Sequence, residues 1–136
     1  MECIFCKIAR KEIPAQVIYE DMHAVGFLDR DPRAAGHTLI VPNRHAETIL
    51  DLQGGEVGTL FSAVREITAL LKKSLHADGF TIGINHGVVA GQAVSHLHVH
   101  VIPRFMGDHG TSIHAVITNP PAESVEAIAK KIMALN

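Results

Sequence analysis

Three histidines at two-residue spacing are the side chains of this sequence best suited to chemistry. Residues 95–104 read Ser-His-Leu-His-Val-His-Val-Ile-Pro-Arg, so His96, His98 and His100 alternate with apolar residues. Alternation favours a β-strand, in which successive side chains point to opposite faces, so the imidazoles would share one face. Their Cα atoms would lie about 6.5–7 Å apart, close enough for one phosphate-sized group to contact two rings. Imidazole, with an unperturbed pKa of about 6.5, suits proton transfer, nucleophilic attack and metal ligation at neutral pH.

The middle histidine, His98, is the candidate nucleophile. If a backbone carbonyl or a neighbouring ring holds the Nδ1 proton, the Nε2 lone pair can attack phosphorus to give a phosphoramidate, and His100 can protonate the leaving group. The three rings could instead hold a catalytic metal, since two histidines at i and i+2 of a strand can share one ion. A third interpretation is a solvent-facing polar stripe. Spacing alone leaves these alternatives open.

A glycine-containing segment precedes the histidines. Residues 87–91 read Gly-Val-Val-Ala-Gly, with Asn85 before them and Gln92 and Ser95 after them. Glycine lets backbone N–H groups approach an anion closely, and the flanking side chains are uncharged hydrogen-bonding groups. The segment is therefore a candidate phosphate-binding loop, with a simple turn as the alternative.

The two cysteines of the chain, Cys3 and Cys6, form a Cys-x-x-Cys half-site for tetrahedral zinc. Such a site needs two more ligands, for which ten histidines are available. A thioredoxin-like redox role is disfavoured because the pair stands at the extreme N-terminus rather than between a strand and a helix. A pair of buried thiols is the alternative.

Composition predicts one globular domain over residues 1–136. A content of 47% hydrophobic residues argues against disorder, and the length is enough to bury a core. The formal net charge of −2 gives no strongly basic field, so we expect no general nucleic-acid binding. No run approaches the roughly 20 apolar residues that cross a bilayer, and the N-terminus lacks a signal-peptide core, so we expect a cytoplasmic protein without membrane association.

The elements that hold these groups follow from apolar periodicity. Short strands are expected at residues 16–19, 23–28, 36–41 and 80–85, in addition to the histidine segment. A long helix should follow Gly54 and Gly55, because apolar residues recur at helical spacing as far as Leu75. A last helix is expected over residues 122–135. Because the strands come in neighbouring runs, we predict an α+β fold: an antiparallel β-sheet with one long helix and a C-terminal helix.

The histidine segment resembles a known family. Residues 96–102, His-Leu-His-Val-His-Val-Ile, match the H-φ-H-φ-H-φ-φ signature of the histidine triad (HIT) proteins, where φ is apolar. Similarity to family segments extends over residues 4–8, 11–15, 27–29, 36–42 and 44–45. The branch that the chain resembles is the HINT-type and bacterial HIT group of homodimeric hydrolases and nucleotidyl-transfer relatives. The resemblance implies a HIT-like fold, a homodimer and a nucleotide derivative as substrate.

The resemblance also implies a covalent mechanism. His98 would take the nucleotidyl group from the α-phosphate of a phosphoramidate, dinucleoside polyphosphate or related compound, and water would then release the nucleoside monophosphate. His100 and His37 would be the phosphate and proton-transfer partners. Alternatives are a metallohydrolase with a catalytic ion on the triad, and a nucleotide-binding sensor or scaffold whose hydrolysis is incidental.

A nucleotide site is implied around these histidines. Asp29 would hold the ribose hydroxyls, since a carboxylate accepts two hydrogen bonds. Asn85 and Gln92 would hold the phosphate or the leaving group. The slot for the base, preferably a purine, would be formed by Ile4, Phe5, Ile8, Phe27 and Leu28. One departure is Ala93, which stands where HINT-type enzymes carry a serine that touches the phosphate or leaving group.

A zinc site is implied as well, with the ligands Cys3, Cys6, His45 and His96. Four protein ligands would make this site closed and structural, and would tie the N-terminus to the catalytic strand. This assignment uses His96 and so argues against a catalytic metal on the triad.

Overall fold

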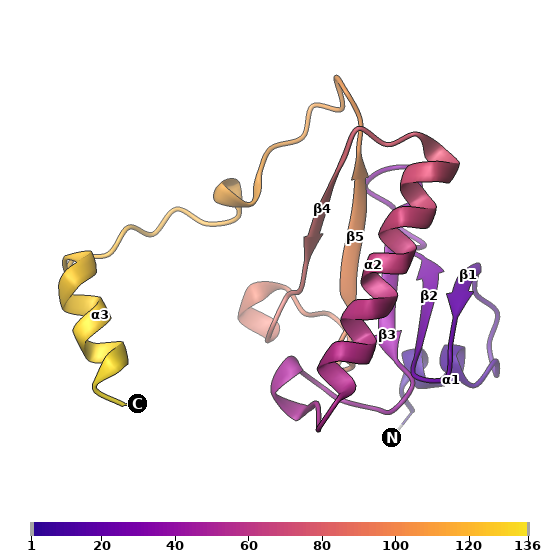
Figure 1. The fold of residues 1–136 in the computed structure, drawn as a ribbon, viewed down its shortest axis with the longest axis horizontal. Coiled ribbons are helices and arrows are strands. Elements are labelled where there is room, and N and C mark those ends of the chain that lie inside the picture. The colour runs from indigo at the N-terminus through magenta and orange to yellow at the C-terminus, as the bar shows by residue number, and fades with distance from the viewer. Residues whose placement is uncertain (1, 136) are drawn as a thin grey trace.

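The computed structural model describes residues 2–135, in which a five-stranded antiparallel sheet carries a long helix on one face (Figure 1). The strands are β1 (Val17–Glu20), β2 (Ala24–Leu28), β3 (Thr38–Pro42), β4 (Gly79–Gly83) and β5 (Val99–Arg104). The helices are α1 (Ile4–Ala9), α2 (Glu56–Leu75) and α3 (Val125–Met133). The strand order is β1-β2-β3-β5-β4, with every pair antiparallel. The predicted α+β class, with its antiparallel sheet, long helix and C-terminal helix, is confirmed.

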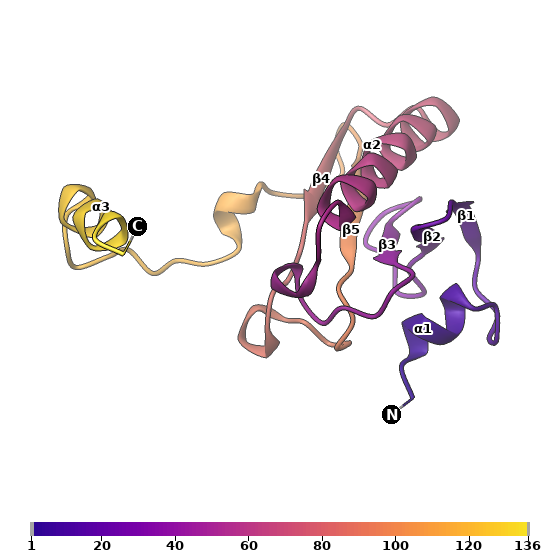
Figure 2. The same cartoon turned by 60° about the horizontal axis from the view of Figure 1, so that its bottom comes forward.

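The sheet is covered on both faces, by α2 on one side and α1 on the other (Figure 2). The core under α2 includes Ile40, Leu60, Ile67, Val99 and Val101, and the core under α1 includes Phe5, Ile8, Phe27, Leu39 and Val41. Alternate residues of an extended chain point to opposite faces. Because the valines of β5 face α2, the histidines that alternate with them lie on the side of α1.

The prediction of a strand over residues 95–104 is wrong in its first half, because β5 begins only at Val99. The backbone N–H of Leu97 donates to the carbonyl of Ala46 at 2.7 Å, outside the sheet ladder. The segment that contains His96 therefore does not pair with β3 and is hydrogen-bonded instead to the loop that follows Pro42. Alternation of apolar and polar residues indicates an extended backbone, but it does not show where ladder pairing starts.

Helix α1 is absent from the predicted elements because six residues are too few to show a helical period. Its N-cap is Cys3, whose Sγ accepts a hydrogen bond from the backbone N–H of Cys6 at 3.4 Å. The two cysteines are thus brought onto one turn. No helix among residues 2–135 is long and apolar enough to cross a membrane.

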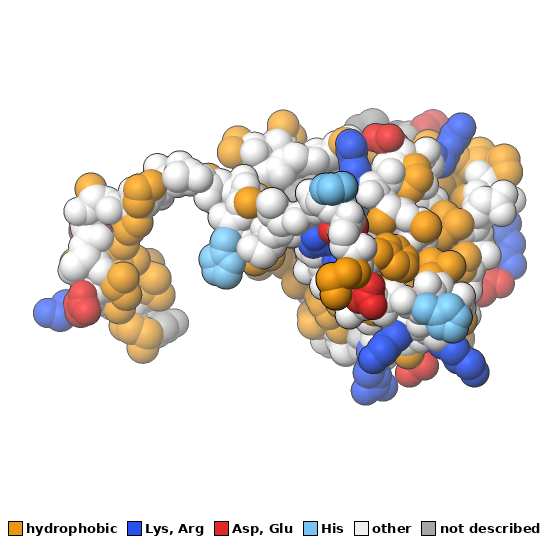
Figure 3. Space-filling model, turned by 90° about the horizontal axis from the view of Figure 1, so that it is seen from above, with side chains coloured by type: hydrophobic (Ala, Val, Ile, Leu, Met, Phe, Trp, Pro, Cys, Tyr) orange, Lys and Arg blue, Asp and Glu red, His pale blue; other side chains and the backbone are white. Residues whose placement is uncertain are grey.

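The C-terminal arm, residues 105–135, extends away from the sheet and ends in α3 (Figure 1). The helix is shorter than the predicted 122–135 because it begins after Ser124, whose side chain caps it by accepting from the backbone N–H of Ala127. No residue of α3 is buried, and Val125 and Ile132 are 74% and 61% exposed. Figure 3 shows hydrophobic side chains along this projecting segment. The apolar side of the helix thus lies at the surface.

Candidate active site and metal centre

A cavity of about 670 Å³ collects most of the predicted nucleotide-site residues. Its lining includes Ile4, Phe5, Ile8, Phe27, Leu28, Asp29, Asn85, His98 and His100. Helix α1 supplies one apolar wall, β2 supplies a second, and the segment with His98 and His100 supplies a third side. A neighbouring cavity of about 600 Å³ shares Asp29, Asn85 and His100 with the first and adds His37. Side chains far apart in the sequence therefore meet around two adjoining spaces.

Sequence reasoning missed one wall of the larger cavity, formed by residues 13–16 between α1 and β1. The only signal was the segment of residues 11–15, which was used only for its family similarity; α1 itself ends at Ala9, and Lys11 turns the chain with a φ of +62°. Ala93, where the family pattern has serine, lines both cavities. It brings no hydroxyl to the space beside His100.

Gln92 is placed differently from the prediction, since it is not among the residues that line either cavity. Its Oε1 accepts from the backbone N–H of Gly87 at 2.9 Å, and its Nε2 donates to the carbonyls of Glu47 at 2.8 Å and Val94 at 3.1 Å. Both ends of the amide are thus used by the backbone. Gln92 braces the loop, and Asn85 is the amide that reaches the cavity.

His98 is oriented by a backbone carbonyl. Its Nδ1 lies 2.8 Å from the carbonyl oxygen of His96, which can only accept a hydrogen bond, so Nδ1 carries the proton. The ring of Phe5 packs edge-on against the imidazole, with centroids 5.1 Å apart. His98 is only 7% exposed, yet it lines the cavity. With Nδ1 held by the carbonyl, Nε2 of this fixed ring is therefore the nitrogen available for attack.

His100 and His37 form a pair beside this nucleophile. Nε2 of His37 lies 3.0 Å from Nδ1 of His100, and the rings of His98 and His100 have centroids 5.1 Å apart. Burial lowers the pKa of His100 to about 4, with the nearby histidines adding to the effect, and burial also lowers the pKa of His37. Both rings are therefore neutral at pH 7, where each carries a single ring proton.

The loop between β2 and β3 positions Asp29 and His37. The backbone N–H of Asp29 donates to the carbonyl of His37 at 2.9 Å and closes the loop. Just before His37, Gly36 has a φ of +86°, and a Cβ at this position would overlap the side chain of Leu75. Only glycine fits both conditions without strain, so Gly36 fixes the entry into β3.

The predicted zinc ligands Cys3, Cys6, His45 and His96 lie together, with their ligand atoms all within 4.8 Å of one another. Nδ1 of His96 is 3.3 Å from Sγ of Cys3, and Nδ1 of His45 is 3.3 Å from Sγ of Cys6. With bonds of about 2.0 Å to nitrogen and 2.3 Å to sulfur, ligand atoms of a tetrahedral zinc site lie roughly 3.3–3.8 Å apart. The spacing fits.

The hydrogen bonding of His96 also fits a metal. Its Nε2 lies 2.9 Å from the carbonyl oxygen of Pro42, which must accept, so the proton is on Nε2 and the Nδ1 lone pair faces the two sulfurs. Burial raises the pKa of the Cys6 thiol, and the neighbouring Cys3 raises it further. Two thiols crowded together in this way favour a cation that stabilises their charge. A zinc ion held by these four side chains would tie α1 to the histidine segment.

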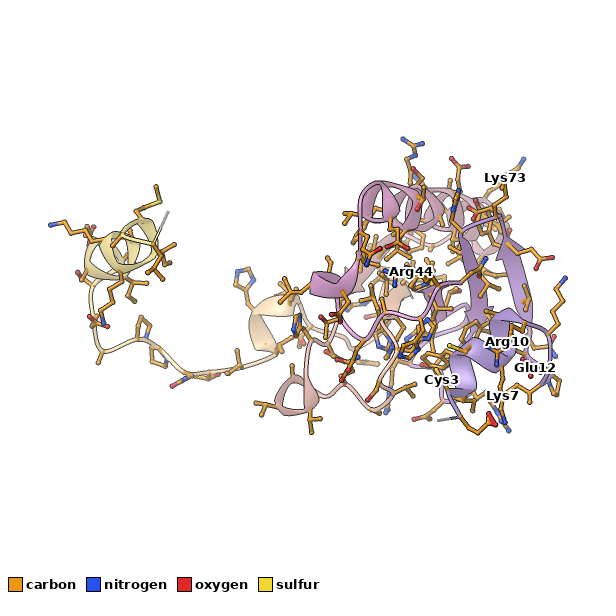
Figure 4. The ribbon with its side chains drawn as sticks, turned by 90° about the horizontal axis from the view of Figure 1, so that it is seen from below. Cys3, Lys7, Arg10, Glu12, Arg44 and Lys73 are labelled. Carbon is orange, nitrogen blue, oxygen red and sulfur yellow. The ribbon has the colours of Figure 1, made fainter. Side chains whose placement is uncertain are left out.

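Arg44 fixes the loop that carries His45. Its guanidinium makes two hydrogen bonds to the carboxylate of Glu56, at 2.7 and 2.6 Å, and one to the carbonyl of Asp51. The guanidinium lowers the pKa of Glu56 to about 2. Figure 4 shows Cys3 at the start of α1 and Arg44 in this loop. The cluster thus joins α1, the loop between β3 and α2, and the segment before β5.

The three triad rings do not converge on one point. Among residues 2–135, His96 groups with the cysteines, and a separate group contains Asp29, His37 and His100. His96, His98 and His100 do not form such a group in this part of the chain. The histidines without a predicted role are all exposed: His23, His76, His86, His109 and His114.

Comparison with known proteins gives a consistent result. The sequence model of the HIT domain family matches residues 10–107. The chain is 49% identical over 106 residues to an uncharacterized HIT-like protein of Methanocaldococcus jannaschii, covering 78% of this chain and 81% of the relative. It is 29% identical to an adenosine 5′-monophosphoramidase of Schizosaccharomyces pombe, over 97% of this chain and 96% of the relative. An adenylylsulfatase of Arabidopsis thaliana is 38% identical, over 76% of this chain and 52% of the relative.

Solved structures share the fold. A HIT family protein of Bacillus subtilis superposes with a TM-score of 0.86 at 31% identity, covering 99% of this chain and 95% of that one. A Zn-bound histidine triad family protein of Mycobacterium smegmatis gives a TM-score of 0.75 at 32% identity, covering 100% of this chain and 99% of that one. The C-terminal arm is included in these superpositions because the coverage is nearly complete.

Proposed function

Because this chain belongs to the HIT domain family, we propose that it hydrolyses purine nucleotide derivatives at the α-phosphate through a covalent intermediate on His98. The observation that carries the proposal is the bond from Nδ1 of His98 to the His96 carbonyl, which leaves Nε2 as an oriented nucleophile at a cavity of nucleotide size. The predicted base slot and Asp29 line the same cavity.

The proposed reaction has two displacements. In the substrate complex the anionic phosphate beside His100 favours the imidazolium form of this ring. Nε2 of His98 attacks the α-phosphorus, the bond from phosphorus to the leaving group breaks, and the imidazolium of His100 gives its Nε2 proton to that group and becomes neutral. Water then attacks the phosphorus, returns a proton to His100 and releases the nucleoside monophosphate from His98. Asp29 accepts hydrogen bonds from the ribose hydroxyls, and Asn85 donates to the phosphate. His37 supports His100 in both steps.

We further propose that Cys3, Cys6, His45 and His96 hold a structural zinc ion. The donor set and spacing support this, as does the Zn-bound relative from Mycobacterium smegmatis. The ion would supply no chemistry to the substrate, and its role would be to hold α1 and the histidine segment together. A catalytic metal on the triad would need three converging rings, whereas Nδ1 of His96 faces the sulfurs.

A homodimer is the oligomeric state that we propose. Strand β4 stands at the edge of the sheet, where its outer backbone groups are open to pairing, and the apolar side of α3 is exposed. Light scattering coupled to size exclusion should give the mass of two chains. The mass of a single chain across the micromolar range would contradict the proposal.

The test of the proposed function is a substrate panel with intact-mass trapping of the intermediate. Adenosine phosphoramidates, dinucleoside polyphosphates and adenylyl sulfate should be hydrolysed to nucleoside monophosphate. Rapid acid-free quenching should show a nucleotidyl adduct that is lost in His98→Ala. Tight nucleotide binding with negligible turnover on all three classes would favour the sensor or scaffold instead. Rapid, reversible loss of turnover on chelation, with the fold intact, would favour the metallohydrolase.

A further inference from the structure

We infer that the backbone N–H of Arg33 sets the protonation pattern of the reaction centre: it fixes the proton of His37 on Nε2, and His37 in turn fixes the proton of His100 on Nε2. His37 is then a positioning residue that acts through His100. The inference deepens the proposed function, on which it rests for the role of His100 as an acid, but the positions of the ring protons can be measured without any substrate.

The first step is the contact of His37 with the loop before it. The backbone N–H of Arg33 lies 3.1 Å from Nδ1 of His37, and an amide N–H can only donate. Nδ1 must therefore hold the lone pair. A neutral imidazole has one ring proton, so that proton is on Nε2. Because His37 is only 3% exposed, water does not compete for this arrangement.

The second step is the contact between the two rings. Nε2 of His37 lies 3.0 Å from Nδ1 of His100 and 3.5 Å from a carboxylate oxygen of Asp29. Only the shorter distance is that of a normal hydrogen bond, so the N–H donates to His100. Nδ1 of His100 must then hold its lone pair, and its proton must be on Nε2.

The third step concerns where this proton can go. Buried side-chain nitrogen and oxygen atoms without a hydrogen-bond partner do not occur among residues 2–135. Nε2 of His100 makes no hydrogen bond with the protein in this part of the chain, so it is open to the cavities that His100 lines. The N–H of His100 therefore meets the ligand, where it can donate a hydrogen bond to a phosphate oxygen or to the leaving group.

The result is a pair of opposite tautomers side by side. His98 carries its proton on Nδ1 and presents a lone pair, whereas His100 carries its proton on Nε2 and presents a donor. One ring can attack while its neighbour donates, and no proton has to move between them first. The same pattern argues against a metal in the group of Asp29, His37 and His100, because Nε2 of His37 is already protonated.

The first experiment is direct. Long-range ¹H–¹⁵N spectra of the full-length ¹⁵N-labelled protein at neutral pH distinguish protonated from unprotonated ring nitrogens. His37 and His100 should be Nε2–H tautomers and His98 the Nδ1–H tautomer. A proton on Nδ1 of either His37 or His100 would overturn the inference. If the tautomers are as stated but the substrate panel shows no turnover, the proposed function fails and the inference stands.

The second experiment compares two substitutions of His37. His37→Gln keeps an N–H donor that can reach Nδ1 of His100, whereas His37→Ala removes it. The Ala variant should lose the single tautomer of His100 and about tenfold or more in kcat, with KM nearly unchanged, because acid catalysis is worth about 10²–10⁴ in rate when complete. The Gln variant should restore both. A single Nε2–H tautomer of His100 in the Ala variant would refute the role of His37.

The third experiment changes only the first donor, the backbone N–H of Arg33. Arg33→Pro removes the backbone N–H, and Arg33→Ala keeps it while deleting the exposed side chain. The Pro variant should show mixed tautomers of His37, whereas the Ala variant should keep the single Nε2–H tautomer of His37. If the Pro variant does not fold, the His37 pair and the direct spectra still decide the question. An altered His37 tautomer in Arg33→Ala would count against the backbone as the cause.

Discussion

His96 and His100 stand four positions apart on the same segment, but they belong to two different centres. In His96, the Nε2–H donates a hydrogen bond to the Pro42 carbonyl, so Nδ1 faces the sulfurs. In His100, Nδ1 accepts a hydrogen bond from His37, so Nε2 faces the cavity. Burial lowers the pKa of each to about 4. The two histidines therefore share both their residue type and their lowered pKa, and neither property separates the two roles. What separates them is which ring nitrogen is hydrogen-bonded to the protein, because the other nitrogen is the one left to face the sulfurs or the cavity.

His98 lies between the two centres and connects them. Its ring belongs to the proposed reaction centre, but its orientation depends on the carbonyl of His96, whose ring belongs to the proposed metal centre. Phe5 adds a second link, since it packs against both imidazoles, with centroids 6.0 Å from His96 and 5.1 Å from His98. Substitutions in the reaction centre should therefore affect rate, and substitutions in the metal centre should affect stability first and rate second.

The sharpest way to test this division is His98→Ala. Loss of the nucleophile should lower kcat by a factor of about 10⁴ or more, as removal of other catalytic nucleophiles does. Nucleotide binding and the melting temperature should change little, because the base slot and the zinc ligands are intact. Steady-state kinetics, calorimetric titration with a nucleoside monophosphate and thermal unfolding measure the three quantities. The exposed His23→Ala is the matched control, and near-normal turnover in His98→Ala would exclude the mechanism.

His100→Gln should have the next largest effect, and the effect should depend on the leaving group. Acid catalysis contributes about 10²–10⁴ in rate when the leaving group needs a proton. An amine leaves only after protonation, whereas sulfate leaves as a stable anion. We therefore expect a loss of about 10² or more in kcat with an adenosine phosphoramidate and a much smaller loss with adenylyl sulfate. Equal losses on the two substrates would show that His100 binds phosphate but does not act as the acid.

These experiments concern contacts that the sequence could not reveal. Alternation of apolar residues predicts the α+β sheet, and residue types and family similarity placed Cys3, His45 and His98 in the hypotheses that are proposed above. The groups that divide the histidines, however, are the carbonyls of Pro42 and His96 and the N–H of Arg33. Almost every residue carries such backbone groups, so the residue types do not indicate which of them will be used. The same reason explains why the sequence did not reveal the position of Gln92, whose hydrogen-bond partners are backbone atoms.

The C-terminal arm shows a second limit of the sequence. Apolar periodicity predicts the helix that became α3, but a stripe of apolar residues does not say what covers it. For α2, the cover is the sheet of the same chain; for α3, no described residue of the helix is buried. Helix α2 is followed by a short connection to β4, whereas residues 105–124 separate α3 from β5.

Removal of zinc should act on the metal centre with a smaller effect on rate. With zinc a thousandfold above its dissociation constant, its loss would cost about 4 kcal/mol of unfolding free energy. Rate should fall by about tenfold to a hundredfold, as for other supports of a site, because Phe5 and the His96 carbonyl are then less well held. Chelation followed by thermal unfolding and kinetics measures both effects, and added zinc should reverse them. Cys6→Ser is the control, since chelation should shift it no further; metal analysis that finds no zinc would remove the site.

The smallest effect concerns how stability depends on pH. Folded His100 has a pKa of about 4, below the ordinary value of 6.5, so between these limits the unfolded chain binds a proton that the folded chain does not. The unfolding free energy must then fall as the pH drops from 6.5 towards 4, by at most about 1.4 kcal/mol per pH unit for one histidine. Above pH 6.5 both states are neutral at this residue, and the contribution is flat.

His100→Gln isolates this contribution, because the metal centre and its own proton uptake are the same in both proteins. The difference between the two unfolding free energies should grow in favour of the variant as the pH is lowered from 6.5 to 5, by about 1.5 kcal/mol. Urea unfolding at a series of pH values measures it. Parallel curves over that range would mean that His100 titrates normally in the folded chain, and hence that its ring is as open to water as those of the exposed histidines rather than enclosed beside His37 and His98.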